Sequence, residues 1–358
     1  MSNQQRNQFR QTVFDRDNHT CIVPWCENDA EDAHHIVERS LWENGGYVPN
    51  NGASVCETHH RAAEDNSIPP QAFWRWADIT TPPLPEGIET SHINKWGDEL
   101  DAPPWKEHRQ TIKYPSTRHL PWSHERDVDD TAHSEVEWGL DIPLVATIKM
   151  DGANSCILRD RDEPIRARNG KQADKDHFDM AKSWYDDKTL YWKIAQVEGC
   201  EEDPDEVEPY LQIFGEWMYA KHSIHYGCDC ETLCEDVGPA LEDYFQVFGV
   251  YDTRYDLWLS WDETVEIADE LDLTVVPPAE EMYHVGEFSN VQEFWDYFYD
   301  LSQNIVSKGH EGIIVRSARP FHYGEIDARL GKYVREDHVK EGEKHWSHRA
   351  LVPNVLSE

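Results

Sequence analysis

Short runs of apolar residues alternate with turn residues and acidic segments along the chain from Lys113 onward. Runs of this length, bounded by turn signals, favour buried β-strands, and they occur at Leu144–Ile148, Tyr210–Phe214, Phe245–Tyr251 and Gly312–Val315. Helical stretches are expected at Asp176–Asp186, Thr264–Leu271 and Val291–Leu301. This order of elements predicts the α+β fold class with a largely antiparallel sheet.

The first 112 residues have a different composition. Residues 10–66 hold three Cys and five His, which indicates a small metal-dependent module. Residues 71–112 are rich in Pro and Trp and read as a linker with one short helix around Gln71–Ala77. Since 358 residues correspond to about two domains, we predict a module at 1–70, the linker at 71–112 and a larger domain at 113–358.

The chain carries 33 Lys and Arg against 70 Asp and Glu, a formal net charge of −37. At ordinary ionic strength this charge argues against affinity for nucleic acid or anionic membranes. However, only 14 of the basic residues are Lys. Acid-rich, Lys-poor chains are typical of halophilic proteins, since the Debye length falls to about 3 Å in molar salt and self-repulsion is screened. On this second interpretation the net charge says little about partners.

No run of 18 apolar residues is present and the first ten residues are polar, so we expect a cytoplasmic protein without a membrane span. The eight Cys are then expected to be thiols or metal ligands rather than disulfides. Cys156 and Cys200 are expected in the core. Cys228, Cys230 and Cys234 fit either a second metal site or a loop with free thiols. The sequence does not determine the oligomeric state.

Two pairs of candidate metal ligands flank the middle of the N-terminal module. Cys21 and Cys26 form one pair, and Cys56 and His59 form the other. Closely spaced pairs of thiolate and imidazole donors suit a tetrahedral structural Zn²⁺. Because a module of about 55 residues has only a small core, this cross-link would supply much of its stability.

Between these pairs lie His34-His35-Ile36 and Asn51, and His60 directly follows the second pair. Together with the cysteines, this arrangement resembles the HNH endonuclease family, with its ββα-metal fold, over roughly residues 10–64. The resemblance implies that His35 is the general base that activates water, and that Asn51 fixes its loop. It also implies that His34 and His60 hold a divalent cation, Mg²⁺ or Mn²⁺, on the scissile phosphate. A structural zinc module with incidental histidines fits the same spacing.

Lys149 directly follows the predicted strand Leu144–Ile148 and opens the hexamer Lys149-Met-Asp-Gly-Ala-Asn154. Partial desolvation at the end of an apolar strand can lower the pKa of a lysine and make it a nucleophile. Gly152 permits the tight turn that would present this lysine. Taken alone, the hexamer fits a structural turn equally well.

Further segments with charged and aromatic residues follow in order, at Arg166–Asn169, Phe214–Trp217, Phe245–Gly249, Glu311–Arg316 and Lys332–Arg335. With the hexamer, this series resembles the motifs of the covalent nucleotidyltransferases, the ligases and capping enzymes. DNA ligases usually carry Arg where Asn154 stands, so the hexamer is most similar to the RNA ligase 2-type family. Additional similarity to bacterial RNA ligases of this type lies at 114–123, 218–224, 260–264 and 338–346.

The resemblance implies an ATP-grasp-like antiparallel-sheet ligase domain. It also implies that Lys149 attacks the α-phosphorus of ATP, that AMP passes to a nucleic-acid 5′-phosphate, and that a 3′-hydroxyl then displaces AMP. Lys332 and a divalent cation are expected to depress the pKa of Lys149. The implied ATP-binding residues are Lys149, Arg168, Glu216, Phe248, Glu311 and Lys332. Support for the later steps is implied for Asp151, Asn154 and Arg335.

These implied residues have separate roles. Lys332 would contact the α-phosphate, and Glu311 would be the acid associated with the metal. Glu216 would contact the ribose or orient the nucleophile. Phe248 would stack on adenine, and Arg168 would hold a phosphate.

The sequence therefore predicts an ATP-dependent RNA ligase fused to a nuclease-like module, acting in nucleic-acid repair or processing. Its expected partner is nucleic acid: RNA, a nicked duplex or an RNA/DNA hybrid. The alternatives are a DNA ligase or a GTP-using capping-type transferase, with the first module as a non-catalytic nucleic-acid clamp. Many relatives have Lys-x-Lys at the last motif. Here Arg335 is expected to supply the second cation.

Overall fold

The computed structural model describes residues 3–23, 26, 28–66, 68–79, 81–91, 93–99, 111–123, 143–173, 176–200, 203–204, 208–228, 237–254, 256–280, 284–285, 288–335 and 351–357. The chain forms two compact units. Unit 1 comprises Met1–His108 with the short pieces Arg254–Asp256 and His322–Glu325. Unit 2 comprises Arg109–Thr253, Leu257–Phe321 and Ile326–Glu358.

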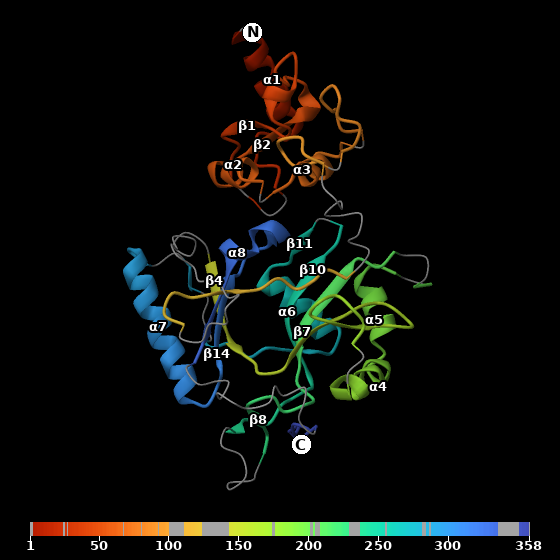
Figure 1. Ribbon diagram of the computed structural model, residues 1–358, viewed down its shortest axis with the longest axis vertical. Helices are drawn as coiled ribbons and strands as arrows, with labels where there is room; N and C mark the ends of the chain where they lie inside the picture. The colour runs from red at the N-terminus through yellow and green to blue at the C-terminus, as the bar shows by residue number, and fades with distance from the viewer. Residues whose placement is uncertain are drawn as a thin grey trace. The chain divides into compact units, whose positions relative to one another are not determined.

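Unit 1 is built around two antiparallel strands and the helix that follows them (Figure 1). Strand β1 (Asp32–His35) pairs with β2 (Gly52–Val55), and the register places His34 opposite Ala53. The helices are α1 (Asn3–Arg16), α2 (Glu57–Glu64) and α3 (Pro70–Trp76), with short 3₁₀ turns at Arg39–Leu41 and Pro49–Asn51.

The core of unit 1 includes residues from the segment that the sequence predicts as a linker. Phe73, Trp74 and Ile93 are buried against Val55 and the Cys56 side of the hairpin. Large aromatic side chains contribute much buried apolar area per residue, and the small hairpin alone offers little. Part of the 71–112 segment therefore belongs to this core.

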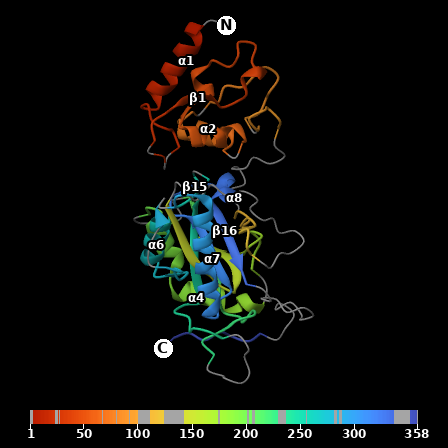
Figure 2. The same ribbon diagram turned by 90° about the vertical axis from the view of Figure 1, so that its left-hand side faces the viewer.

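Unit 2 contains two main sheets that are mostly antiparallel (Figures 1 and 2). The seven-stranded sheet has the order β15-β11-β10-β7-β5-β6, with β12 paired parallel to β10. Its strands are β5 (Ala153–Ile157), β6 (Ile165–Ala167), β7 (Leu211–Trp217), β10 (Phe245–Asp252), β11 (Leu257–Trp258), β12 (Thr274–Val275) and β15 (Phe321–His322). The α+β prediction is confirmed.

The five-stranded sheet has the order β13-β4-β14-β16-β3. Its strands are β3 (Arg118–His119), β4 (Pro143–Lys149), β13 (His284–Val285), β14 (Gly312–Ser317) and β16 (Leu330–Val334). A small parallel pair joins β8 (His225–Tyr226) and β9 (Val237–Gly238). The helices of unit 2 are α4 (Asp179–Asp187), α5 (Leu190–Val197), α6 (Trp261–Glu270), α7 (Val291–Ser307) and α8 (Ile326–Arg329), with 3₁₀ turns at Asp176–Phe178 and Tyr323–Glu325.

Each main sheet buries one face against helices. Helix α7 lies along the five-stranded sheet (Figures 1 and 2), where its Phe294 and Phe298 join the core with Val145 and Ile313. Phe294 and Phe298 thus form part of the packed face of this helix. The seven-stranded sheet buries its outer face against α4, α5 and α6. The opposite face of each sheet, which these helices do not cover, lines a cavity between the two sheets.

Several elements differ from the sequence prediction for local reasons. Helix α6 begins at Trp261 rather than Thr264, because Ser260 caps it: the Ser260 hydroxyl accepts from the Glu263 N–H, and the Glu263 carboxylate accepts from the Ser260 N–H. Helix α1 was not predicted, since only Phe9 and Val13 are buried among its residues 4–16 and most of its other residues are polar.

The cysteines divide into two groups. Cys156 and Cys200 are free thiols, as predicted, although only Cys156 is buried. Cys228 forms a disulfide, which corrects the expectation of free thiols or metal ligands there. Cys230, Cys234 and the 338–346 motif lie outside the described residues. Among the described residues, no helix combines the length and apolar character needed to span a membrane.

Candidate functional site

Lys149 ends strand β4, and the pairing of β4 with β14 decides what stands beside it. In this register Lys149 lies opposite Gly312, so Glu311, just before β14, is adjacent to it. The Lys149 Nζ donates to Glu311 Oε1 although 162 positions separate the two residues. Gly312 is required here, because a Cβ at this position would meet the Tyr333 carbonyl oxygen at 1.9 Å. The strand pairing thus forms the contact between the candidate nucleophile and an acid.

A cavity of about 660 Å³ opens around Lys149 and is lined from both main sheets. The residues of the predicted ATP-binding set that line it are Lys149, Arg168, Glu216, Phe248 and Lys332. Glu311 reaches the same site through its contact with Lys149. The structure therefore brings all six residues together, although they come from β4, β7, β10, β16, the position just before β14 and the position just after β6.

The charges in this cavity act against the pKa shift predicted for Lys149. Burial by itself lowers the pKa of the amine, but the carboxylates of Glu311, Glu216 and Asp151 favour its charged form. The pKa of Lys149 is raised as a result. The predicted depression is thus not found in this arrangement of side chains, because the carboxylates outweigh burial.

Glu216 lies within β7 opposite Asn154 and faces the cavity. Burial, with the nearby charges of Glu311 and Asp151, raises its pKa to about 8, while Lys149 acts in the opposite direction. Asn154 also lines the cavity, and its Oδ1 is buried without a hydrogen-bond partner among the described residues. A buried acceptor of this kind is available to a ligand donor.

Phe248 stands at a bulge of β10, where the register with β7 shifts between Val247 and Gly249. Its ring contacts Tyr114 at 5.2 Å between centroids, and Tyr114 in turn contacts Trp258 at 5.5 Å. All three rings line the cavity. Sequence reasoning missed Trp258 and gave Tyr114 no role, because no local pattern joins residues so far apart.

Arg316 also lines the cavity and supports this bulge. Its guanidinium is buried and donates to the Phe248 and Leu259 carbonyl oxygens, both at 2.9 Å. Burial lowers the pKa of Arg316 to about 10, so it stays charged at neutral pH. It fixes the backbone on which the aromatic wall is built.

The residues predicted to support later steps take different positions. Asp151 does not line the cavity, and its Oδ2 accepts from the N–H groups of Ser223 and Ile224, both at 2.7 Å. Arg335 does not line the cavity, although its backbone N–H donates to the Glu311 carbonyl oxygen at 2.9 Å. Of the three, only Asn154 faces the cavity directly.

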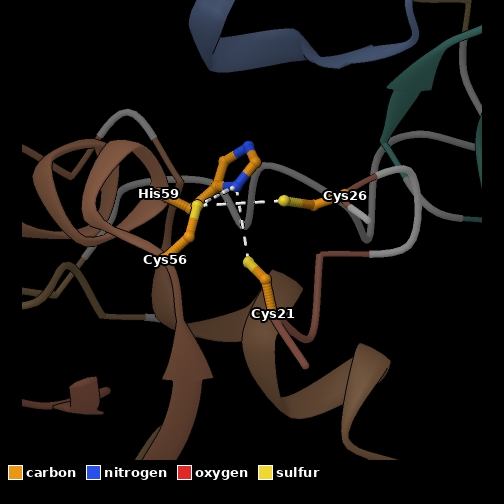
Figure 3. A group of neighbouring side chains, drawn as sticks. All are labelled: Cys21, Cys26, Cys56 and His59. Carbon is orange, nitrogen blue, oxygen red and sulfur yellow. Dashed lines mark hydrogen bonds between the residues drawn. The ribbon is translucent and has the colours of Figure 1, made fainter. Parts of the chain in front are cut away.

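In unit 1, Cys21, Cys26, Cys56 and His59 converge on one point (Figure 3). Their donor atoms all lie within 4.8 Å of one another, with 3.8 Å between the Cys26 and Cys56 sulfurs. That separation matches the edge of a tetrahedron with Zn–S bonds of about 2.3 Å, which is about 3.8 Å. Cys56 caps α2, so the helix start places His59 one turn along. The four donors fit a structural Zn²⁺.

A second donor cluster contains His34, His60 and Glu64. Glu64 Oε1 lies 3.4 Å from His34 Nδ1 and 3.4 Å from His60 Nε2. Glu64 was missed from the sequence, although residues four apart on a helix share a face. Its other oxygen contacts the buried Lys95 ammonium at 2.5 Å. Hydrogen bonding to His34 and the Lys95 charge hold the pKa of Glu64 well below its usual value. Two imidazoles and a carboxylate fit a divalent cation.

His35 lies outside this donor cluster. Successive strand residues face opposite sides, and the His35 ring stacks on Phe9 at 4.7 Å and meets the edge of Tyr47 at 5.0 Å. Burial lowers its pKa to about 4, so the ring is neutral at pH 7. Its Nε2 is buried without a hydrogen-bond partner among the described residues.

Asn51 fixes the backbone at Val37, two residues after His35. The Asn51 Oδ1 accepts from the Val37 N–H at 2.9 Å, and its Nδ2 donates to the Val37 carbonyl.

The RNA ligase family model matches residues 142–334, which is more than half of the chain. The chain belongs to the RNA ligase family. The matched span runs from β4 to β16 and includes Lys149, Glu216, Glu311 and Lys332. Unit 1 up to His108 lies outside it.

Solved structures similar to this RNA ligase family member share little sequence with it. An archaeal ATP-dependent RNA ligase is 16% identical, with 62% of this chain and 48% of that chain covered, at a TM-score of 0.35. A Naegleria gruberi RNA ligase mutant with ATP and Mn is 12% identical, with 67% and 63% covered, at 0.37. A putative ATP-dependent DNA ligase from Aquifex aeolicus is 15% identical, with 56% and 48% covered, at 0.33. No curated protein matches the sequence significantly. The chain thus covers about half the length of the archaeal ligase, and the family assignment rests on the sequence match.

Proposed function

We propose that this RNA ligase family member is an ATP-dependent RNA ligase that works through lysyl-AMP on Lys149. The supporting observation is the single cavity in which the Lys149 amine meets Glu311, with Lys332, Arg168 and Glu216 on the walls. The cavity is large enough for a nucleotide and joins an aromatic wall to a cationic region.

In the first step, the Lys149 amine attacks the α-phosphorus of ATP, a P–N bond forms and pyrophosphate leaves. Phe248 supplies a face for the adenine ring. Lys332 and Arg168 supply positive charge to phosphate oxygens, where negative charge develops. A divalent cation held by Glu311 would offset the carboxylates that raise the pKa of Lys149 and favour the neutral amine.

In the second step, a nucleic-acid 5′-phosphate oxygen attacks the adenylate phosphorus, and the P–N bond to Lys149 breaks. A 3′-hydroxyl then attacks the 5′-phosphate, and AMP leaves as the phosphodiester forms. Asn154 faces the cavity and can donate or accept at the nucleotide. We propose RNA as the preferred substrate, and a nicked duplex or RNA/DNA hybrid as the form in which the ends are presented.

The experiment is incubation of the full chain with α-labelled ATP, or GTP, in high KCl, followed by a denaturing gel. We expect label from ATP and none with Lys149→Ala, while Lys182→Ala on the exposed side of α4 labels as the unmodified protein does. Label retained by Lys149→Ala rejects the assigned nucleophile, and label from GTP favours a capping-type transferase. Sealing of nicks with RNA or DNA 3′-OH ends then separates RNA ligase from DNA ligase.

We further propose that unit 1 is an HNH-like, metal-dependent nuclease module. The support is the hairpin-and-helix order β1, β2 and α2, with one donor cluster fit for zinc and a second at His34, His60 and Glu64. In this proposal Zn²⁺ on the cysteine cluster is structural. Mg²⁺ or Mn²⁺ on the second cluster would polarise a phosphate, and His35, neutral at pH 7, would accept a proton from water.

The nuclease proposal is tested by nicking assays on the full chain with Mg²⁺ or Mn²⁺. His60→Ala and His35→Ala should each abolish cleavage, while His19→Ala, an exposed histidine of the same unit, should not. Binding of nucleic acid without cleavage by the unmodified protein would reject the nuclease and favour a zinc-containing clamp.

A further inference from the structure

The segment 351–357 runs in extended form along the loop that follows β7, near β8 (Figure 1). The Lys221 N–H donates to the Val352 carbonyl at 2.8 Å, and the Val355 N–H donates to the Tyr226 carbonyl at 3.0 Å. Beyond them, the Leu241 N–H donates to the Val355 carbonyl at 3.1 Å. The segment therefore joins the loop 218–226 to the chain before β10, mostly through backbone hydrogen bonds.

One side chain of the segment, Asn354, ties both ends of that loop. Asn354 is 2% exposed. Its Oδ1 accepts from the Tyr226 N–H at 3.0 Å, and its Nδ2 donates to the Met218 carbonyl at 2.7 Å. Its own N–H donates to the Tyr219 carbonyl at 2.8 Å. An amide side chain offers a donor and an acceptor together, which is what the two ends of the loop require.

The same loop holds the turn that follows Lys149. Ser223 and Ile224 donate their N–H groups to the Asp151 carboxylate, both at 2.7 Å, and the Asp151 N–H donates to the Tyr226 hydroxyl at 3.2 Å. The turn also packs closely on the start of the loop, because a Cβ at Gly152 would meet the Met218 sulfur at 2.5 Å. Asp151 is thus fixed by backbone groups whose own positions Asn354 fixes.

We infer that Asn354 is a positioning residue for nucleotidyl transfer: by closing the loop 218–226 it fixes Asp151 and the turn that presents Lys149 to the nucleotide. The inference rests on the proposed role of Lys149. Asn354 does not line the cavity. It therefore acts through the loop and not through contact with substrate, and its loss should slow the chemical step more than it weakens nucleotide binding.

The test is single-turnover adenylylation of the full chain with labelled ATP. Asn354→Ala should lower the rate constant at saturating ATP by on the order of tenfold, since small misplacements of a nucleophile have effects of this size or larger. The ATP concentration at half-maximal rate and the amplitude of labelling should change less than about twofold. Val352→Ala is the matched control, because that side chain is 42% exposed and the segment binds there through its backbone.

A second variant, Asn354→Asp, separates positioning from simple loss of structure. Its ionised carboxylate cannot donate to the Met218 carbonyl, whereas the protonated form can. As the pH is lowered from 8 to 6, the rate constant of the unmodified protein divided by that of Asn354→Asp should therefore decrease. The same ratio for Asn354→Ala should stay constant. Reduced amplitude with an unchanged rate constant, or equal pH dependence for both variants, overturns the inference.

A double-mutant cycle places Asp151 in the same chain of contacts. Asp151→Ala and Asn354→Ala should be less than additive in the adenylylation rate, although the printed hydrogen bonds of the two side chains go to different partners in the loop. Additive effects count against the inference. If the unmodified protein forms no adenylate on Lys149, the proposed function itself fails, and this outcome is distinct from normal labelling by all Asn354 variants.

Discussion

The zinc-type cluster of unit 1 and the lysine cavity of unit 2 are assembled in opposite ways. The first takes its four donors from positions 21 to 59, two on a loop and two at the start of α2. The second takes its residues from positions 149 to 332 and needs two sheets to bring them together. Local spacing therefore predicts the first directly, whereas the second depends on strand register. The two sites should respond differently to the same kind of perturbation.

The largest expected difference follows removal of the Zn²⁺ that we propose for the cysteine cluster. Cys56→Ala or chelation should abolish the cooperative unfolding of unit 1, because structural Zn²⁺ contributes about 10 kcal/mol or more in small modules. Adenylylation at Lys149 should change less than about twofold. Metal content and calorimetry check the first part, and labelling checks the second. Cys200→Ser is the control, and equal loss of both properties would show that the two sites are not independent.

A smaller effect is expected from Asn51, which is fully buried and bonds both backbone groups of Val37. Asn51→Ala should lower the free energy of unfolding of unit 1 by about 3 kcal/mol, since buried partners are left unsatisfied. The neighbouring Asn50 is exposed, so Asn50→Ala should change the free energy of unfolding of unit 1 by less than about 0.5 kcal/mol. Thermal unfolding of the two variants measures the difference, and similar values for both would contradict the role of Asn51.

In unit 2, substitution of Glu216 is expected to raise the free energy of unfolding, whereas the Asn51 substitution lowers it in unit 1. Its pKa is raised to about 8 from 4.5, so the folded state binds more protons between these values and stability falls as pH rises from 4.5 to 8. Glu216→Gln lacks this titration and should be more stable by about 1–2 kcal/mol at pH 8, yet slower in adenylylation. The stability difference should vanish near pH 4.5. A constant difference across this range would rule out titration of Glu216 as its cause.

A pH-dependent effect on the stability of unit 1 is expected from His35. Its pKa falls from 6.5 to about 4 on folding, so the unfolded state binds more protons between these values. The free energy of unfolding of unit 1 should therefore decrease as pH drops from 6.5 to 4. His35→Gln should remove this part of the pH dependence, as followed by thermal unfolding. If the pH dependence of the free energy of unfolding were unchanged in His35→Gln, other titratable groups would be its cause.

The elements that the sequence predicted well are those whose signals are local. The apolar runs at 144–148 and 245–251 became β4 and β10, and Pro70–Trp76 formed the helix expected near Gln71. Helix α1 was missed because it buries only a narrow stripe. The sequence also does not reveal that Glu311, Glu216 and Asp151 surround the Lys149 amine and raise its pKa in the absence of a cation, so the predicted depression with a divalent cation stays a prediction.

The sequence by itself determined the order of the motifs, the ligand pairs around Cys21 and Cys56, and the candidate nucleophile, since each depends on residues close together in the chain. Only the tertiary structure decided that Glu311 touches Lys149, that Glu64 joins His34 and His60, and that Asn354 ties the loop supporting Asp151. Apart from His60 and Glu64, which lie four residues apart on α2, these contacts join positions that are distant in the chain or on separate elements. They depend on packing and on strand register, which follows from the hydrophobic pattern and turn geometry of whole strands and not from any single motif.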